Sequence, residues 1–316
     1  MEVVKPFVKW AGGKGSLIPQ LEKFYPYELE SGCINRYVEP FVGGGAVLIS
    51  ILQQYDIKEA YAFDINKDLI NCYNTIKENV EALIKELKVK EKDFLKLEQE
   101  DRQLYFYNVR DEYNSYKLGK KHDVKRAAEF IFLNKTCFNG LYRVNKKGEF
   151  NVPCGKYKNP TICDEKNLRN LSKLIQNVTF EYGDYQKSRE HIDENTFVYF
   201  DPPYRPLSTS GFTSYTKEDF NDDDQKTLAS YYKELDLKKA KLMLSNSNPK
   251  NTNKNDTFFE EIYDGFYINE ILANRFINSN PDGRGKISEL LITNYDQKEM
   301  NECTQESTIL MKATLS

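Results

Sequence analysis

The chain has 316 residues, 40% of them hydrophobic, which predicts a sizeable core in one large domain or two unequal ones. Its net charge of −3 leaves any nucleic-acid contact to local basic patches, and it shows neither an apolar run of membrane-spanning length nor a signal-peptide core. Six cysteines without a C-x-x-C pair and only two histidines favour neither a disulfide framework nor a zinc site, so we expect a reduced, cytoplasmic protein without a metal ion.

The first motif spans residues 7–14 and contains Trp10, Gly12, Gly13 and Lys14. Paired glycines allow the backbone to approach another group closely. A phosphate-binding loop would need Gly at position 8 and Ser or Thr at position 15, where the chain has Val and Gly. The motif is therefore not a Walker loop, and a glycine turn beside a buried Trp10 is the simpler alternative.

Residues 36–39 and 46–52 predict a strand and a helix joined by a glycine turn at residues 43–45. A dinucleotide fingerprint needs Gly or Ala three residues later, and Leu48 there argues against NAD. A second strand, residues 57–63, leads to Asp64, about 20 residues beyond the glycines, the spacing at which an acid meets ribose hydroxyls. A nucleoside cofactor without a pyrophosphate fits better, S-adenosylmethionine being the plainest candidate; alternatively Asp64 only begins a helix.

Residues 67–135 show mostly helical periodicity. Residues 141–145 and 149–152 then predict two short strands around a Lys-Lys-Gly turn, which is a hairpin signal. The hairpin and its flanks carry Arg143 and lysines 135, 146, 147, 156 and 158. Because arginine can pair with guanine and lysine can meet phosphates, a basic hairpin fits a DNA groove, although a solvated surface hairpin is the alternative.

The C-terminal half predicts alternating helices and strands. We expect helices at residues 168–175 and 222–235, strands at 178–182, 241–244, 267–272 and 287–294, a loop at 274–286 whose Arg275, Arg284 and Lys286 could meet phosphates, and a frayed tail beyond 296.

The buried-strand pattern of residues 196–200 ends at the sequence Asp201-Pro202-Pro203-Tyr204. In an open α/β sheet, ligands bind at the carboxyl ends of such strands. The Asp201 carboxylate and the Pro202 carbonyl can both accept from the amine of a flat base, and Tyr204 offers a ring for stacking. The alternative is a plain strand-ending turn with Tyr204 as ordinary packing.

Together, residues 7–14, 38–45, 138–153 and 201–204 resemble the Dam-like family of DNA adenine-N6 methyltransferases, the D12 class, in the motif order of the alpha group. The resemblance implies an α/β fold, a Rossmann-like S-adenosylmethionine-dependent methyltransferase sheet with an inserted, mostly helical target-recognition domain that carries the β-hairpin. It implies a catalytic domain of residues 1–66 and 178–300, a target-recognition domain of residues 67–177 and a flexible tail of residues 301–316.

Residues 139–145, 150–160 and 284–294 look especially like restriction-associated members that modify the adenine of GATC. The resemblance therefore implies double-stranded DNA as substrate, flipping of the target base, and a restriction endonuclease as a functional partner without direct contact. We expect a monomer that does not enter a membrane.

Carried over to this chain, the resemblance implies three sets of site residues. The catalytic set is Asp201, Pro202 and Tyr204. The cofactor-binding set is Trp10, Ala11, Gly12, Lys14, Phe41, Gly43, Asp64, Asp184 and Asp201. The DNA-binding set is Lys9, Phe138, Asn139, Leu141, Arg143 and Pro153, with Phe138 at a position where many members have a tyrosine that inserts into the duplex.

Other functions remain open on the sequence alone. A cytosine-N4 methyltransferase shares the scaffold but usually has Ser at the place of Asp201, and protein or RNA amino-methyltransferases usually have Asn there. A Rossmann-type oxidoreductase or a catalytically silent DNA-binding module would be a different class. Leu48 argues against the oxidoreductase, and the intact Asp201 and Tyr204 argue against the silent module.

Overall fold

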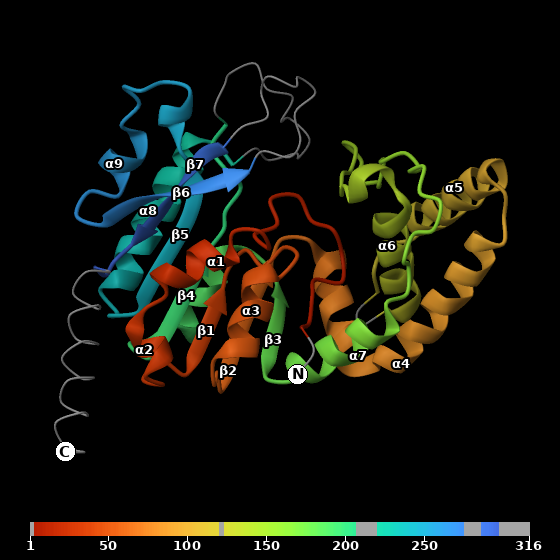
Figure 1. Ribbon diagram of the computed structural model, residues 1–316, viewed down its shortest axis with the longest axis horizontal. Coiled ribbons are helices and arrows are strands. Elements are labelled where there is room, and N and C mark those ends of the chain that lie inside the picture. The colour runs from red at the N-terminus through yellow and green to blue at the C-terminus, as the bar shows by residue number, and fades with distance from the viewer. Residues whose placement is uncertain (1–2, 120–122, 207–219, 275–285, 297–316) are drawn as a thin grey trace.

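A mixed β-sheet forms the centre of the part of the chain that the computed structural model describes, namely residues 3–119, 123–206, 220–274 and 286–296. In this part seven strands pair in the order β3-β2-β1-β4-β5-β7-β6 (Figure 1). The strands from β3 to β5 run parallel, whereas β7 runs antiparallel to both β5 and β6. The α/β class and the mostly parallel sheet predicted from the sequence are confirmed. The strands are β1 (Arg36–Glu39), β2 (Glu59–Asp64), β3 (Val178–Tyr182), β4 (Thr196–Phe200), β5 (Lys241–Ser247), β6 (Tyr267–Asn274) and β7 (Lys286–Thr293).

Helices cover both faces of this sheet, and a helical region extends away from one end of it (Figure 1). The α-helices of the described residues are α1 (Ile18–Leu21), α2 (Tyr27–Glu30), α3 (Ala46–Gln54), α4 (Lys67–Leu95), α5 (Gln99–Ser115), α6 (Val124–Thr136), α7 (Glu165–Leu174), α8 (Asp222–Asp236) and α9 (Phe258–Ile262). Short 3₁₀ turns are η1 (Glu22–Phe24), η2 (Phe138–Gly140), η3 (Tyr185–His191) and η4 (Pro249–Asn251). No helix in these ranges combines the length and the apolar character that a membrane crossing needs.

Strand β4 lies in the middle of the sheet, and all of its residues are buried. Phe197 and Tyr199 belong to the core that contains side chains of α3 and α4. Val198 and Phe200 belong to a second core, built with α8 and α9. Because both faces are covered, the strand sequence is continuously apolar instead of alternating.

Helices α4, α5 and α6 form the helical region at the right of Figure 1, which confirms that residues 67–135 are mostly helical. The Asn66 side chain accepts from two backbone amides and so begins α4, and α4 is kinked at Asn79, whose φ is −136°. Asp68 ties the three helices together, because it accepts from the Arg126 guanidinium at 2.6 Å and from the Tyr113 hydroxyl at 2.6 Å.

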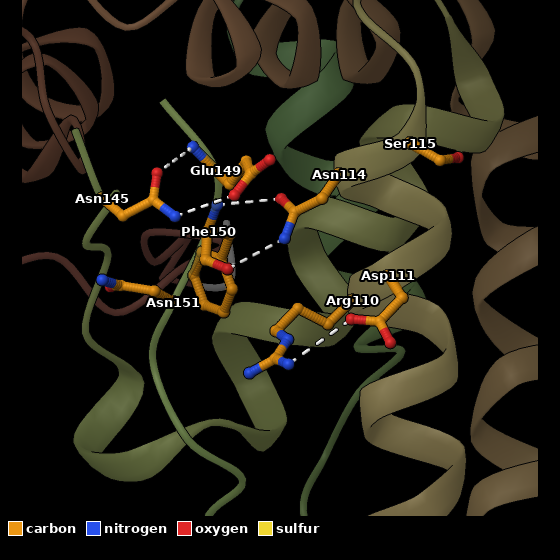
Figure 2. A pocket seen from close by; sticks show the side chains of 8 residues that line it. All are labelled: Arg110, Asp111, Asn114, Ser115, Asn145, Glu149, Phe150 and Asn151. Carbon is orange, nitrogen blue, oxygen red and sulfur yellow. Dashed lines mark hydrogen bonds and ion pairs between the residues drawn. The ribbon is translucent and has the colours of Figure 1, made fainter. Parts of the chain in front are cut away.

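The segment after α6 differs from the predicted hairpin. Regular strands at residues 141–145 and 149–152 do not form; antiparallel pairing is limited to isolated bridges, one of them between Val144 and Phe150. Two backbone bonds flank this bridge, from the Asn145 amide to the Glu149 carbonyl at 2.9 Å and from the Asn151 amide to the Arg143 carbonyl at 3.1 Å. The N–H and the C=O of Phe150 point away from Val144 and bond the Asn114 side chain of α5 at 2.8 and 3.0 Å (Figure 2). The chain still reverses direction at Gly148, whose φ is 79°. We call residues 137–155 the recognition loop.

Several predicted features lie outside the described residues. They are Arg275 and Arg284 of the loop at 274–286, and the tail of residues 301–316.

Candidate active site

The carboxyl ends of four neighbouring parallel strands bring the predicted catalytic and cofactor residues to one edge of the sheet. Strand β1 pairs with β2 on one side and with β4 on the other. Glu39 ends β1, Asp64 ends β2 and Asp201 follows β4. The order of the strands therefore gathers three carboxyl groups at the edge where open α/β sheets bind ligands.

Lys14 links the first glycine motif to Asp201. Its ammonium lies 2.8 Å from the Asp201 carboxylate and donates to the Gly12 carbonyl at 2.9 Å, and the Lys14 side chain is almost fully buried. Burial raises the pKa of Asp201, and the Lys14 charge opposes that rise. The Lys14 charge thus favours the ionised carboxylate in a place where burial favours its protonation.

Tyr204 lies beside this ion pair and is held at its far end. The phenol donates to the Glu289 carboxylate on β7 at 2.6 Å. The Lys14 ammonium sits over the ring, 4.6 Å from its centroid, in a cation–π contact. An ion pair, a cation–π contact and a hydrogen bond thus join Lys14, Asp201, Tyr204 and Glu289 in one continuous network.

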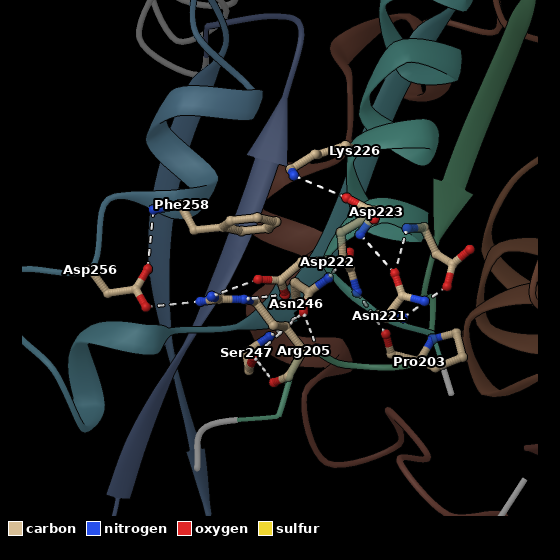
Figure 3. Close-up of polar contacts among 12 residues, drawn as sticks. Pro203, Arg205, Asn221, Asp222, Asp223, Lys226, Asn246, Ser247, Asp256 and Phe258 are labelled. Atoms are coloured by element: carbon tan, nitrogen blue, oxygen red, sulfur yellow. Dashed lines mark hydrogen bonds and ion pairs between the residues drawn. The ribbon is translucent and has the colours of Figure 1, made fainter. Parts of the chain in front are cut away.

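The backbone around Tyr204 is fixed by buried polar side chains (Figure 3). Gln225 donates to the Pro203 carbonyl at 3.0 Å, and the Arg205 amide donates to Asn246 at 3.1 Å. The Ser247 hydroxyl donates to the Arg205 carbonyl at 2.7 Å. Gln225 and Asn246 have no exposed surface. These bonds set the path of the chain directly before and after Tyr204.

The Arg205 side chain strengthens the same anchor (Figure 3). Its guanidinium lies 2.7 Å from the Asp222 carboxylate at the start of α8 and 2.9 Å from the Asp256 carboxylate. It also stacks on Phe258, 4.2 Å from the ring centroid. The residue that follows Tyr204 is therefore tied to two separate elements.

Glu39 is a buried acid to which the sequence assigned no role. The Tyr37 hydroxyl donates to it at 2.7 Å, and burial raises its pKa to about 8, with Asp201 adding to the rise. At neutral pH the group is therefore mostly protonated. An acid followed by Pro40 at the end of a buried strand was the signal that could have found it.

The glycine turn after β1 is bound to Asp64. The Gly43 amide donates to the Asp64 carboxylate at 3.0 Å, and the Asn66 amide donates to its other oxygen at 2.7 Å. Burial raises the pKa of Asp64 to about 6. Each carboxylate oxygen has a second lone pair, so Asp64 can still accept hydroxyl groups from a ligand.

Gly43 must be a glycine because Trp10 packs against it. Its φ is +45°, and a Cβ atom there would lie 2.9 Å from the indole Cδ1. The indole also stacks on Tyr142 of the recognition loop, with centroids 5.5 Å apart and an angle of 23°. Trp10 therefore connects the glycine turn to the recognition loop.

The remaining cofactor candidates lie around this edge. Ala11 and Gly12 are exposed next to buried Lys14. Phe41 stacks on Tyr185 of η3, with centroids 5.2 Å apart. Asp184 is exposed after β3, where its side chain accepts from the Gln186 amide at 2.9 Å and begins η3. Its neighbour Gly183 donates to the Asp64 carbonyl at 3.1 Å, so Asp184 lies close to Asp64 along the edge of the sheet.

The predicted DNA-binding residues meet on the recognition loop and the stretch of chain before Trp10. Asn134, which is buried, bonds both the N–H and the C=O of Lys9 at 2.9 Å and donates to the Gly140 carbonyl at 3.0 Å. The Phe138 amide donates to the Pro153 carbonyl at 2.9 Å. The Phe138 ring is 53% exposed. Asn139, Leu141 and Pro153 are exposed beside it.

Arg143 is half-buried, and Asn151 helps to orient its guanidinium. Nε donates to the Asn151 side chain at 2.7 Å and an Nη group donates to the Asn151 carbonyl at 3.1 Å. Asn151 also lines a pocket of about 350 Å³ between α5 and the recognition loop (Figure 2). That pocket includes none of the predicted catalytic or cofactor residues, so it is separate from the edge of the sheet.

The ionisable side chains form no metal centre in the part of the chain described. No group of three or more His, Cys, Asp or Glu residues there is placed to hold a metal ion. The five cysteines seen there are all free thiols.

Comparisons with known proteins identify the family. Residues 10–277 match the family model of the D12 class N6 adenine-specific DNA methyltransferases. The chain is 55% identical to the Type II methyltransferase M.MjaIII of Methanocaldococcus jannaschii over 294 residues, which cover 92% of this chain and 99% of the relative. It is 34% identical to a DNA adenine methylase of Haemophilus influenzae, with 91% and 92% of the two chains covered. It is 33% identical to a DNA adenine methylase of Escherichia coli, with 92% and 95% covered. The family resemblance read from the sequence is thus confirmed, and the chain belongs to the D12 class of N6 adenine-specific DNA methyltransferases.

Proposed function

We propose that this enzyme methylates the N6 atom of adenine within GATC in double-stranded DNA, that S-adenosylmethionine is the methyl donor, and that Asp201, Pro202 and Tyr204 hold the flipped base. The membership in the family already makes it an adenine-specific DNA methyltransferase. The single observation that carries the assignment of the base site is the buried Lys14–Asp201 ion pair beside the Tyr204 ring.

The chemistry of the amine explains why this pair is suitable. The adenine N6 lone pair is delocalised into the ring, so the amine is a poor nucleophile. Hydrogen bonds from the NH₂ group to the Asp201 carboxylate and the Pro202 carbonyl favour a more tetrahedral nitrogen, whose lone pair can then attack a methyl carbon in line. An ionised carboxylate is required for this, and the Lys14 charge favours that state.

An adenine in a duplex can reach this edge only after leaving the base stack, at a cost of a few kcal/mol. Stacking on Tyr204 returns ~1–3 kcal/mol of that cost. The anchored backbone on both sides of Tyr204 supports this role, because a stacking ring must be in place before the base arrives.

The residues at the edge of the sheet fit S-adenosylmethionine. Asp64 keeps free lone pairs for ribose hydroxyls, and the partly exposed Phe41 ring offers a stacking face. Trp10, Ala11, Gly12, Lys14 and Gly43 surround the turn, and Asp184 lies on the side of Asp64 away from Asp201. When bound, the donor supplies an electrophilic methyl group on a sulfonium. The chain supplies orientation: Lys14 and Asp64 fix the two ends of the edge that the donor would occupy.

For DNA recognition we propose residues 67–177 as the target-recognition domain and residues 1–66 and 178–300 as the catalytic domain. Lys9, Asn139, Leu141, Arg143 and Pro153 would meet base edges, and the exposed Phe138 ring would enter the duplex beside the displaced base. The recognition sequence GATC rests on the resemblance of residues 139–145, 150–160 and 284–294 to GATC-modifying members.

The biological setting follows from the same proposal. A relative that is a Type II methyltransferase supports a restriction endonuclease as a functional partner, without direct contact. We place the enzyme in the cytoplasm, where it acts on duplex DNA as a monomer.

The test combines a plasmid experiment with one variant. Plasmid from a host that lacks its own adenine methylation, but expresses this enzyme, should resist GATC-cutting enzymes that methylation blocks and be cut by those that require it. Purified Asp201→Ala should transfer no methyl group while donor binding, measured by calorimetry, persists. Asp56→Ala, at an exposed acid, is the matched control.

Two results would contradict the proposal. N4-methylcytosine in the digested product, identified by mass spectrometry, would overturn the assignment of the base. Methyl transfer by Asp201→Ala at the wild-type rate would overturn the role of the carboxylate.

A further inference from the structure

Glu289 of β7 touches the catalytic motif but belongs to none of the residue sets derived above. The Tyr204 hydroxyl donates to a Glu289 carboxylate oxygen at 2.6 Å, a short bond in which the acceptor is charged. Tyr204 is half-buried and follows β4, whereas Glu289 comes from the reversed strand two places along the sheet.

The backbone at Glu289 is rigid. It lies opposite Ser247 of β5 and Ile271 of β6, so β7 is paired on both sides at this point. The preceding residue, Ser288, is bonded through its backbone by Asn251, at 2.7 and 3.2 Å. An acceptor on such a frame can hold the group bonded to it in one place.

The bond to Glu289 acts at the part of Tyr204 that the backbone leaves free to rotate. Hydrogen bonds to Pro203 and Arg205 set the position of the Cα atom, but the ring still has two free torsions. The hydroxyl oxygen is the side-chain atom farthest from Cα, so one bond there restricts the first torsion. The oxygen lies on the axis of the second torsion, which the bond restricts because a phenolic O–H prefers to donate in the plane of its ring. The Lys14 ammonium lies over one face of the ring, so the face proposed for a planar ligand is the opposite one.

We infer that Glu289 is a positioning residue for the methyl-transfer reaction: it holds the Tyr204 ring in the plane in which the extruded adenine stacks. The inference rests on the proposed function, because it assumes that Tyr204 receives the base. Glu289 acts through the phenol hydroxyl and does not itself contact the reacting atoms.

The test is a double-mutant cycle between the two residues. Tyr204→Phe removes the hydroxyl and Glu289→Ala removes its acceptor. Each should lower the single-turnover rate of methylation about tenfold, the effect of one charge-assisted hydrogen bond. The double variant should be no slower than the slower single variant, because both changes remove the same bond. Glu289→Gln keeps an acceptor oxygen and should retain at least about a third of the rate.

A spectroscopic readout separates positioning from folding. A duplex with 2-aminopurine in place of the target adenine reports the stacking of the extruded base through quenching of its fluorescence. Glu289→Ala and Tyr204→Phe should show equally reduced quenching, and Glu289→Gln should be close to wild type. Calorimetric binding of S-adenosylmethionine should not change in any of them. Glu270→Gln, an exposed acid on β6, is the matched control and should behave as wild type.

The outcomes distinguish this inference from the proposed base site. Additive losses in the cycle, or a wild-type rate in Glu289→Ala, would overturn the inference. If Tyr204→Ala loses methylation while both Glu289 variants remain active, the base site stands and only the positioning role fails. If Tyr204→Ala is fully active, the base site itself is wrong and the role of Glu289 falls with it.

Discussion

The ammonium of Lys14 lies 2.8 Å from the carboxylate of Asp201, so the first glycine motif of the chain is bonded directly to the catalytic motif. The family resemblance assigned Lys14 to the cofactor set and Asp201 to both the catalytic and the cofactor sets. The bond between them means that one cation faces both proposed sites.

Replacing Lys14 with methionine should shift the pH dependence of methylation. The Lys14 charge lowers the pKa of Asp201 against the effect of burial, so its removal raises that pKa. In the proposed mechanism the ionised Asp201 carboxylate accepts a hydrogen bond from the adenine amine. The acid limb of the kcat/KM profile should therefore move to higher pH. The rate at pH 7 should fall about tenfold or more and recover partly at pH 9. Lys5→Met, at an exposed lysine, should leave the profile unchanged; an unchanged profile in Lys14→Met would disprove the link.

Arg143 should be the clearest determinant of sequence specificity. Loss of a bidentate guanine contact in Arg143→Ala should reduce discrimination at one base pair by about 1–3 kcal/mol. Asn151→Ala should cause a smaller loss at the same base pair, because Asn151 orients the guanidinium. The measurement is kcat/KM on duplexes with single substitutions. Lys147→Ala, a control at an exposed lysine, should weaken all duplexes alike. Equal losses on cognate and scrambled DNA would make Arg143 a phosphate contact instead.

Asn134→Ala should weaken DNA binding and leave donor binding intact. It removes the amide that joins Lys9 to the recognition loop at Gly140. Leaving those buried backbone groups unpaired should cost ~1–3 kcal/mol of unfolding free energy. Denaturant titration and DNA affinity measure the two effects. Asn74→Ala on α4, a half-buried amide with a long hydrogen bond of 3.4 Å, is the control and should not change DNA affinity.

The buried acid Glu39 should make the protein less stable in alkali. Its pKa rises from 4.5 to about 8 on folding, so the folded state binds the proton more tightly. The stabilisation is complete below about pH 4.5 and is lost as the pH rises toward 8. Glu39→Gln has no ionisable group at this position. Its unfolding free energy relative to that of wild type should therefore rise by about 2 kcal/mol between pH 6 and pH 9. Exposed Glu59→Gln should show no comparable gain.

Local patterns predicted the elements of the sheet well. The apolar run at residues 196–200 forms β4. A strand that is buried on both faces is continuously apolar, so its sequence alone identifies it. The proline pair then located the end of the strand. The family motifs gave the class of reaction, which the family model confirms.

Contacts between distant segments were beyond local patterns. The pairing of Lys14 with Asp201 depends on how the chain before α1 folds over the end of β4. Glu289 reaches Tyr204 only because β7 inserts in reverse between β5 and β6. The predicted hairpin strands shorten to a bridge between Val144 and Phe150, which Asn114, on another helix, bonds from its outer side. Each of these depends on tertiary geometry that residue spacing does not carry.

The indole of Trp10 has a thermodynamic consequence. It packs on Gly43 beside the proposed donor residues and stacks on Tyr142 of the recognition loop. A ligand that shifts this ring from one side therefore changes the free energy of ligand binding on the other side. By linkage, donor and cognate duplex must then alter each other's dissociation constant by the same factor. An enzyme built this way would hold its methyl source with a different affinity once it has found its sequence.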